Sequence, residues 1–200
     1  MVVSREGSAG ADIPPAEQGE LDDLTLARAQ LGEAAARRAV VDRYQRRVHA
    51  LVGRMLAGRP ALIPDTAQEA FMKIFLGLPR FDSRRGARLS TWMLTVTTRV
   101  CLDVLRKKAL PAEEVPSSLS GDSDPEGEAA HRQLGRRVES AMARLPEDLR
   151  AVLVLRAYHD FDYDEIASTL DIEVGTVKSR LARARLALRE AVEGTPWAIR

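Results

Sequence analysis

The stretch that decides the fold lies near the C-terminus, at residues 145–192: LPEDLRAVLVLRAYHDFDYDEIASTLDIEVGTVKSRLARARLALREAV. Its apolar residues recur at three- and four-residue intervals. This spacing predicts helices over Glu147–Tyr158 and Tyr163–Leu170 and a long helix from about Gly175. A tight turn, Asp171–Val174, joins the last two. Two helices joined by a turn of about three to four residues form a helix-turn-helix.

Local signals indicate where these helices begin. Pro146 suits a helix start, and the acids Glu147 and Asp148 favour the positive end of the helix dipole. Asp162 is a suitable N-cap for the second helix. The buried positions predicted for the last two helices and their turn are Ile166, Ala167, Leu170, Ile172, Val177, Leu181, Ala184 and Leu188.

The outward face of the long helix has the composition of a DNA-reading surface. It carries Thr176, Lys178, Ser179, Arg180, Ala182, Arg183 and Arg185. Ala182 is small enough for the helix to approach base edges, and Lys178 and Arg183 can donate to guanine acceptors or phosphates. Arg180 and Arg185 add charge for phosphates. The alternative is an ordinary basic amphipathic helix, but the acidic helix before it separates charge within one small module.

The first half of the chain also has a helical pattern. Apolar spacing and Gly or Pro stop signals predict four helices: Leu21–Gln30, Glu33–Leu56, Pro64 to about Gly77 or Leu78, and a helix capped by Ser90 that reaches about Lys107.

Two other segments have different compositions. Residues 1–20 contain few large apolar side chains and are expected to form a disordered tail. Residues 109–130 hold three Pro, four Ser and six acids, which is typical of a linker. The predicted fold is therefore all-α, with two helical domains, 21–108 and 131–194, joined by a flexible acidic linker.

The helix that begins near Pro64 has two distinct faces. At about 100° per residue, one side is apolar and suits a core. The opposite side carries Asp65, Gln68, Glu69, Met72 and Leu76. An exposed Met and Leu ringed by polar groups suit a protein partner better than solvent. A merely solvated face is the alternative.

The helix after Ser90 places a mixed stripe outward. The stripe comprises Trp92, Thr95, Arg99, Asp103 and Arg106, and Lys107 follows it. Basic groups beside an aromatic ring suit single-stranded DNA, because charge follows the phosphates and rings stack on bases. In the structural alternative, Asp103 only forms ion pairs with Arg99 and Arg106 along the helix.

The net charge of +1 conceals a strong segregation along the chain. Residues 1–34 carry −5, residues 35–108 carry +11, residues 109–130 carry −6 and residues 131–200 carry +1. Such alternation predicts basic surfaces that bind nucleic acid, together with acidic segments whose negative charge cancels theirs in the total. The linker reaches about 75 Å when extended, about two turns of DNA, so two readers could bind separate elements. A solubilising spacer explains the linker equally well.

Composition argues against several other classes of protein. A single cysteine, Cys101, leaves no internal disulfide framework. No membrane insertion is expected, because no apolar run approaches the ~18 residues of a span. Without a secretory signal, a cytoplasmic protein is expected. His49, His131 and His159 lack ligand spacing, so no metal is expected. No cofactor or enzyme activity is expected, since phosphate-loop and catalytic patterns are missing.

Three segments resemble a known family, the bacterial sigma factors. The string EIASTLDIEVGTVKSRLARAR resembles their region 4 helix-turn-helix, in particular that of the extracytoplasmic-function (ECF) group. Many relatives have Gly at the position of Asp171, but Asp tolerates a left-handed backbone, so the turn is expected to survive. DTAQEAF at 65–71 resembles the segment that docks on the RNA polymerase β′ coiled coil, and 89–108 resembles the helix for promoter opening and −10 readout.

The resemblance implies an ECF-type sigma factor of the sigma-70 family. Such a chain binds core RNA polymerase at the β′ coiled coil and the β flap, the latter through about Glu147–Arg156. It reads the −35 element with the long C-terminal helix and the −10 element with the Trp92 stripe, and it helps to melt promoter DNA. An anti-sigma factor is implied as a further partner. Arg99 departs from the family, where many members have Asn.

One other function remains open from the residues. A stand-alone helix-turn-helix regulator would use its N-terminal half for an effector or for dimerisation. The docking segment near Gln68 and the Trp92 helix would then have no purpose. Association with core polymerase separates the two hypotheses.

Overall fold

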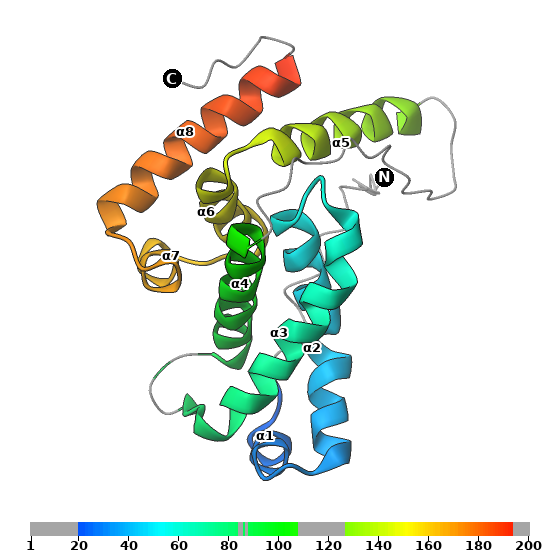
Figure 1. Ribbon diagram of the computed structural model, residues 1–200, viewed down its shortest axis with the longest axis vertical. Coiled ribbons are helices and arrows are strands. Elements are labelled where there is room, and N and C mark those ends of the chain that lie inside the picture. The colour runs from blue at the N-terminus through cyan, green and yellow to red at the C-terminus, as the bar shows by residue number, and fades with distance from the viewer. Residues whose placement is uncertain (1–19, 84–85, 87, 108–126, 194–200) are drawn as a thin grey trace, which may run out of the picture.

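The computed structural model describes residues 20–83, 86, 88–107 and 127–193. Most of the predicted tail, 1–20, and most of the predicted linker, 109–130, lie outside these residues. All regular structure within the described ranges is helical, which confirms the predicted all-α class (Figure 1).

The N-terminal half consists of four α-helices and two 3₁₀ turns. These are α1 (Asp23–Gln30), α2 (Ala34–Met55), η1 (Pro60–Leu62), α3 (Ile63–Gly77), η2 (Leu78–Arg80) and α4 (Leu89–Lys107). Both α2 and α3 pack against α4. The contact is apolar, because α2 contributes Val48 and Leu51, α3 contributes Ile74 and α4 contributes Met93 and Val100, all of them buried.

The start of α4 differs from the prediction. Ser90 lies in the first turn and not at the N-cap, since the helix begins at Leu89. Its backbone N–H donates to Glu20 Oε2 at 3.2 Å, and its hydroxyl donates to the same carboxylate. The Tyr44 hydroxyl also donates to Glu20, at 3.0 Å. A side chain 70 residues earlier in the chain therefore satisfies this helix end, as a cap would.

The C-terminal half consists of α5 (Gly127–Arg144), α6 (Glu147–Tyr158), α7 (Tyr163–Leu170) and α8 (Val174–Glu193). The bounds of α6 and α7 are those predicted, and α8 begins one residue earlier than predicted. The start of α5 at Gly127 lies inside the segment predicted as linker.

Two local devices form the helix-turn-helix. Asp162 Oδ1 accepts from the Glu165 N–H at 2.7 Å, and Glu165 Oε2 accepts from the Asp162 N–H at 2.9 Å. This reciprocal pair is a capping box. At the other end of α7, Asp171 has φ +54°, so the left-handed turn survives without glycine. The turn directs α8 across α6 and α7.

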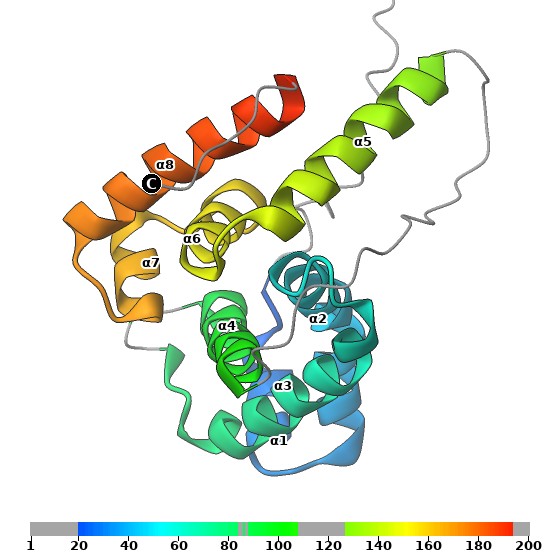
Figure 2. The same ribbon diagram turned by 45° about the horizontal axis from the view of Figure 1, so that its top comes forward.

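Helix α6 lies between α8 and the N-terminal half in both views (Figures 1 and 2). It packs against α8 on one side and α2 on the other, and every residue of Leu149–Leu155 is buried. A helix buried on all sides belongs to the interior. The buried apolar residues of both halves accordingly form one continuous cluster. None of the described helices has the length and apolar composition needed to cross a membrane.

Candidate functional site

The outward face of α8 is open to solvent at most of the predicted positions. Lys178, Ser179, Ala182, Arg183 and Arg185 are exposed, and Thr176 is half-buried. The face points outward because Val177, Leu181 and Ala184 anchor the opposite side of the helix in the core. The structure thus brings a row of basic and small polar side chains together on the second helix of the helix-turn-helix.

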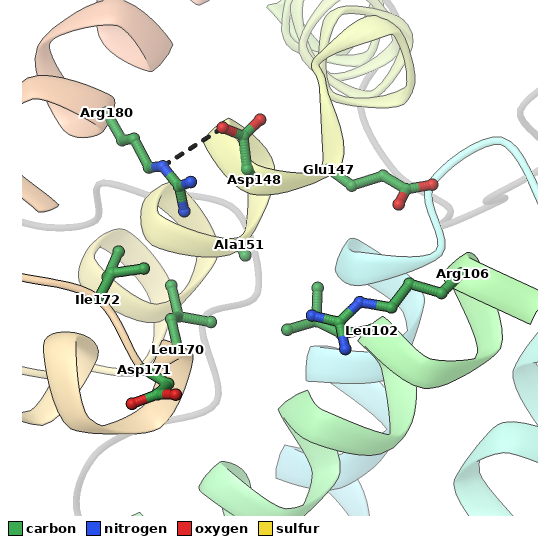
Figure 3. A pocket seen from close by; sticks show the side chains of 9 residues that line it. All are labelled: Leu102, Arg106, Glu147, Asp148, Ala151, Leu170, Asp171, Ile172 and Arg180. Carbon is green, nitrogen blue, oxygen red and sulfur yellow. Dashed lines mark ion pairs between the residues drawn. The ribbon is translucent and has the colours of Figure 1, made fainter. Parts of the chain in front are cut away.

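Arg180, which was also predicted to contact DNA, does not lie on this exposed face of α8. Its Nε is 3.3 Å from Asp148 Oδ2 of α6, and its side chain is about three-quarters buried. Both residues line a cavity of about 440 Å³ between α4 on one side and α6, α7 and the start of α8 on the other (Figure 3). Arg180 therefore ties α8 to α6, and its positive charge is already paired within the chain.

The polar face of α3 has the predicted exposure. Met72 is 59% exposed and Leu76 is 77% exposed. Asp65 and Gln68 are also exposed, and Glu69 is half-buried. Thr66, Ala67, Ala70 and Ile74 hold the other side of the helix in the core. Two large apolar side chains thus stand in solvent within a polar rim.

Lys73 joins this face to α4, and the sequence patterns did not identify it. Its Nζ lies 3.1 Å from Glu69 Oε1 on the same helix and 3.7 Å from Asp103 Oδ2 on α4. The bridge fixes the orientation of Asp103, which also lies 3.7 Å from Arg106 Nη1. The i,i+4 spacing to Glu69 was visible in the sequence, but the contact with Asp103 depends on how the helices pack.

Trp92 lies at the N-terminal end of the α4 stripe and is half-buried. Its ring centroid lies 5.1 Å from that of Phe81, with the planes tilted by 39°. Its edge crosses Gly77 so closely that a Cβ there would lie 3.0 Å from Trp92 Cζ2. The ring is held in one place, and only part of its surface is available for stacking.

The centre of the predicted α4 stripe contacts α7. The hydroxyl oxygens of Thr95 and Thr169 are 3.0 Å apart. Arg99 donates from Nε to the Thr169 carbonyl at 3.4 Å and from Nη2 to the Ser168 carbonyl at 3.3 Å. Both residues therefore contact α7, Thr95 from a half-buried position and Arg99 with much of its side chain still exposed to solvent. At the C-terminal end of the stripe, Arg106 and Lys107 are exposed.

A second set of polar contacts joins α2 and α6. Arg150 is only 4% exposed, and its guanidinium donates to the Ala57 carbonyl at 2.9 Å and the Leu145 carbonyl at 3.3 Å. Burial lowers the pKa of Arg150. Arg59 lies 3.4 Å from Glu147. These contacts between the two halves of the chain were not predicted, because partners as much as 93 residues apart leave no local pattern in the sequence.

Neither redox nor metal chemistry is indicated in the described part of the chain. Cys101 is buried, and burial raises the pKa of its thiol to about 12, so it stays protonated and unreactive. No three His, Cys, Asp or Glu side chains gather there in a way that could hold a metal ion.

Both halves match models of one protein family. Residues 40–110 match "Sigma-70 region 2", and residues 135–188 match "Sigma-70, region 4". The first match includes the exposed face of α3 and the α4 stripe. The second includes the helix-turn-helix and α8 as far as Leu188.

Two curated relatives are similar over most of their length. The chain is 34% identical to the ECF RNA polymerase sigma-E factor of Escherichia coli strain K12 over 185 residues, which cover 86% of this chain and 94% of the relative. It is 31% identical to the ECF RNA polymerase sigma factor SigW of Bacillus subtilis strain 168 over 172 residues, which cover 80% and 90%.

Solved structures share the fold. The sigma factor RpoE of Bartonella quintana, in complex with the anti-sigma factor NepR, matches with a TM-score of 0.64 and 20% identity over 78% of this chain and 96% of that one. CnrH, in complex with the cytosolic domain of CnrY, matches with a TM-score of 0.61 and 22% identity over 86% and 97%.

Proposed function

The chain belongs to the sigma-70 family, within the ECF group of RNA polymerase sigma factors that direct promoter-specific initiation, and from this premise we propose how its surfaces divide that task. Helix α8 reads the −35 element, α4 reads and helps to open the −10 element, and α3 docks on the polymerase. The sigma factor performs no covalent chemistry. It acts in the cytoplasm, where its polymerase and DNA are.

The −35 assignment rests on the exposed face of α8. Helix α8 is the second helix of the helix-turn-helix, and this second helix is the one that enters the major groove. Lys178 and Arg183 are free to donate to guanine or phosphate oxygens, while Ala182 leaves room for the base edges. Arg185 adds a phosphate contact. This exposed basic face is the single observation that carries the proposal.

The −10 assignment rests on the α4 stripe. Trp92 offers part of an aromatic face, and Arg106 and Lys107 supply positive charge at the end of the helix, a combination that suits unpaired DNA. Thr95, Arg99 and Asp103 complete the stripe. Arg99 replaces the Asn that many family members carry, so the preferred −10 bases should differ from theirs.

Polymerase docking rests on the exposed Met72 and Leu76 of α3, with Asp65, Gln68 and Glu69 around them. Apolar side chains within a polar rim are the anatomy of a protein interface. The β′ coiled coil is the partner for this face and the β flap is the partner for α6. An anti-sigma factor is a further partner, as NepR is for the sigma factor RpoE in the solved complex.

Two substitutions test the division of labour. Arg183→Ala should abolish most −35-dependent transcription and leave binding to core polymerase unchanged, because Arg183 is exposed on α8.

Met72→Lys should weaken core binding at least tenfold, which corresponds to about 1.4 kcal/mol, because it places a charge in an apolar contact.

A matched control addresses non-specific effects of the new charge. Leu31→Lys changes a residue of the N-terminal half that is 89% exposed and lies outside the α3 face, so core binding should persist. If no variant and not even the unchanged chain associates with core polymerase, the sigma assignment is wrong. If Arg183→Ala loses core binding and transcription equally, Arg183 supports the fold and does not read DNA.

A further inference from the structure

The largest group of positive charges in the N-terminal half lies on α2, a helix to which the proposed division of labour gives no role. Helix α2 carries six arginines and a single acid, Asp42. Of the 16 basic residues in 35–108, the −10 surface uses only Arg99, Arg106 and Lys107. The strong positive charge of this segment is therefore not explained by the −10 surface alone.

One side of α2 is exposed along most of its length. We call it the α2 stripe, because its exposed positions recur every three or four residues, at Ala35, Arg38, Asp42, Gln45, Arg46 and His49. The opposite side of the helix is buried through Val40, Tyr44, Val48 and Leu51. Steps of three and four residues return to the same side of a helix, so the α2 stripe faces away from the core.

The two arginines of the α2 stripe keep their charges available. Arg38 and Arg46 are exposed, and neither forms an ion pair with an acid in the described part of the chain. Arg180 of α8, by contrast, is paired with Asp148. Eight residues separate Arg38 from Arg46, which is about 12 Å along the helix axis. One DNA strand presents roughly three to four phosphates over that length.

The composition of the α2 stripe suits a phosphate backbone better than a protein surface. The large apolar side chains that stand exposed among the described residues lie on other elements, such as Met72 and Leu76 of α3, and none lies on α2. A protein interface needs an apolar core, which α3 offers and α2 does not. Arginine forms forked hydrogen bonds with phosphate oxygens, and the Gln45 amide beside Arg46 can donate to them as well.

We propose that the α2 stripe is a third DNA-binding surface, on which Arg38 and Arg46 bind phosphates of double-stranded promoter DNA without reading its sequence. This inference rests on the proposed function, because it requires a chain that works on promoter DNA. The stripe is separate from the −35 face of α8 and from the −10 stripe of α4. It adds affinity and not specificity, since contacts with phosphates carry no sequence information.

Two matched double variants test the α2 stripe. Arg38→Gln with Arg46→Gln removes two exposed charges from it, and glutamine has nearly the helix propensity of arginine. The control, Arg28→Gln with Arg144→Gln, removes two exposed charges from other helices. Asp42→Asn makes the opposite change, because it removes the acid of α2.

Each holoenzyme then transcribes DNA randomised at both elements over a range of salt concentrations, with the template dilute enough for the yield to follow DNA affinity. Each phosphate contact steepens the fall of log affinity with log salt by about 0.9. The double variant of the α2 stripe should therefore show a slope that is shallower by about 1.8, with core binding and the transcribed sequences unchanged. The control pair should behave as the unchanged chain, and Asp42→Asn should give more transcript at high salt.

Three results would contradict these expectations in different ways. Equal slopes for the two double variants, with an active unchanged chain, overturn the inference alone. Weaker binding of Arg38→Gln with Arg46→Gln to core polymerase also overturns it, because the α2 stripe would then contact a protein. If the unchanged chain gives no more transcript than core polymerase alone, the proposed function fails, and the inference fails with it.

Discussion

At the scale of single residues, His159 lies where a positive charge is unfavourable. It follows α6 at the contact with α2, and its Nε2 has no hydrogen-bond partner among the described residues. Burial first, and then the positive charges of Arg54 and Arg47, lower the pKa of His159 to about 4. In the unfolded chain the imidazole of His159 has its ordinary pKa of about 6.5, so it binds a proton more readily than in the folded protein.

The sign of the pH effect follows from this difference. Between about pH 6.5 and pH 4 the unfolded state binds more protons, so the free energy of unfolding should fall as the pH falls, by up to about 3 kcal/mol. Urea unfolding at several pH values should show that His159→Gln removes this part of the slope. His49→Gln, at an exposed position on α2, should not. Parallel pH curves for His159→Gln and the unchanged chain would contradict the assignment.

Two glycines offer a matched test of packing around Trp92. A Cβ at Gly77 would lie 3.0 Å from the Trp92 ring, whereas a Cβ at Gly53 would meet nothing within 4 Å. Alanine is favoured over glycine in a helix by about 1 kcal/mol. Gly53→Ala should therefore raise the free energy of unfolding by about that amount, while Gly77→Ala should not, because Trp92 is also packed against Phe81.

Fluorescence reports on the same pair of variants. In a Trp197→Phe background, Gly77→Ala should shift the emission of Trp92, and Gly53→Ala should leave it unchanged. An equal gain in stability from both substitutions, with no spectral shift, would show that the ring has more room than the structure gives it.

At the scale of elements, α7 depends on its ends. With eight residues it is too short to be stable as an isolated helix. The capping box of Asp162 and Glu165 satisfies its first turn, and Asp171 together with Arg99 satisfies its last. Because α7 packs against α8 and also contacts Thr95 and Arg99 of α4, these few hydrogen bonds affect the positions of both proposed DNA-reading helices.

Removing the N-cap of α7 should have a measurable cost. Asp162→Ala should lower the free energy of unfolding by about 1 kcal/mol, because the Glu165 N–H loses its acceptor. Asp164→Ala removes an exposed acid from the same turn without removing the cap, so its effect should be less than half as large. Chemical denaturation compares the two, and equal losses would mean that the capping box contributes nothing beyond charge.

The elements also show which features local sequence could predict. The bounds of α6 and α7, and the start of α8 to within one residue, followed from apolar spacing, Pro146 and the Asp162 cap, because such signals act within a few residues. The acceptor from Glu20 at the start of α4 and the Arg99 contact with α7 were not predicted. Each joins residues about 70 apart, and periodicity carries no information on which surfaces meet.

At the scale of the whole molecule, the segregated charge acquires a structural explanation. The +11 segment, 35–108, includes α4, and the acidic start of α7 lies beside that helix. The exposed face of α8 could be predicted as a basic surface, and so could the apolar pair on α3. The sequence could not indicate that Arg180 pairs with Asp148 or that both halves share one apolar cluster.

The most direct test of the central claim is a promoter selection with core RNA polymerase and this chain on DNA randomised at both elements. We predict that the transcribed templates share two sequence blocks at a fixed separation, one for α8 and one for α4. Transcripts no different from those of core polymerase alone would contradict the account.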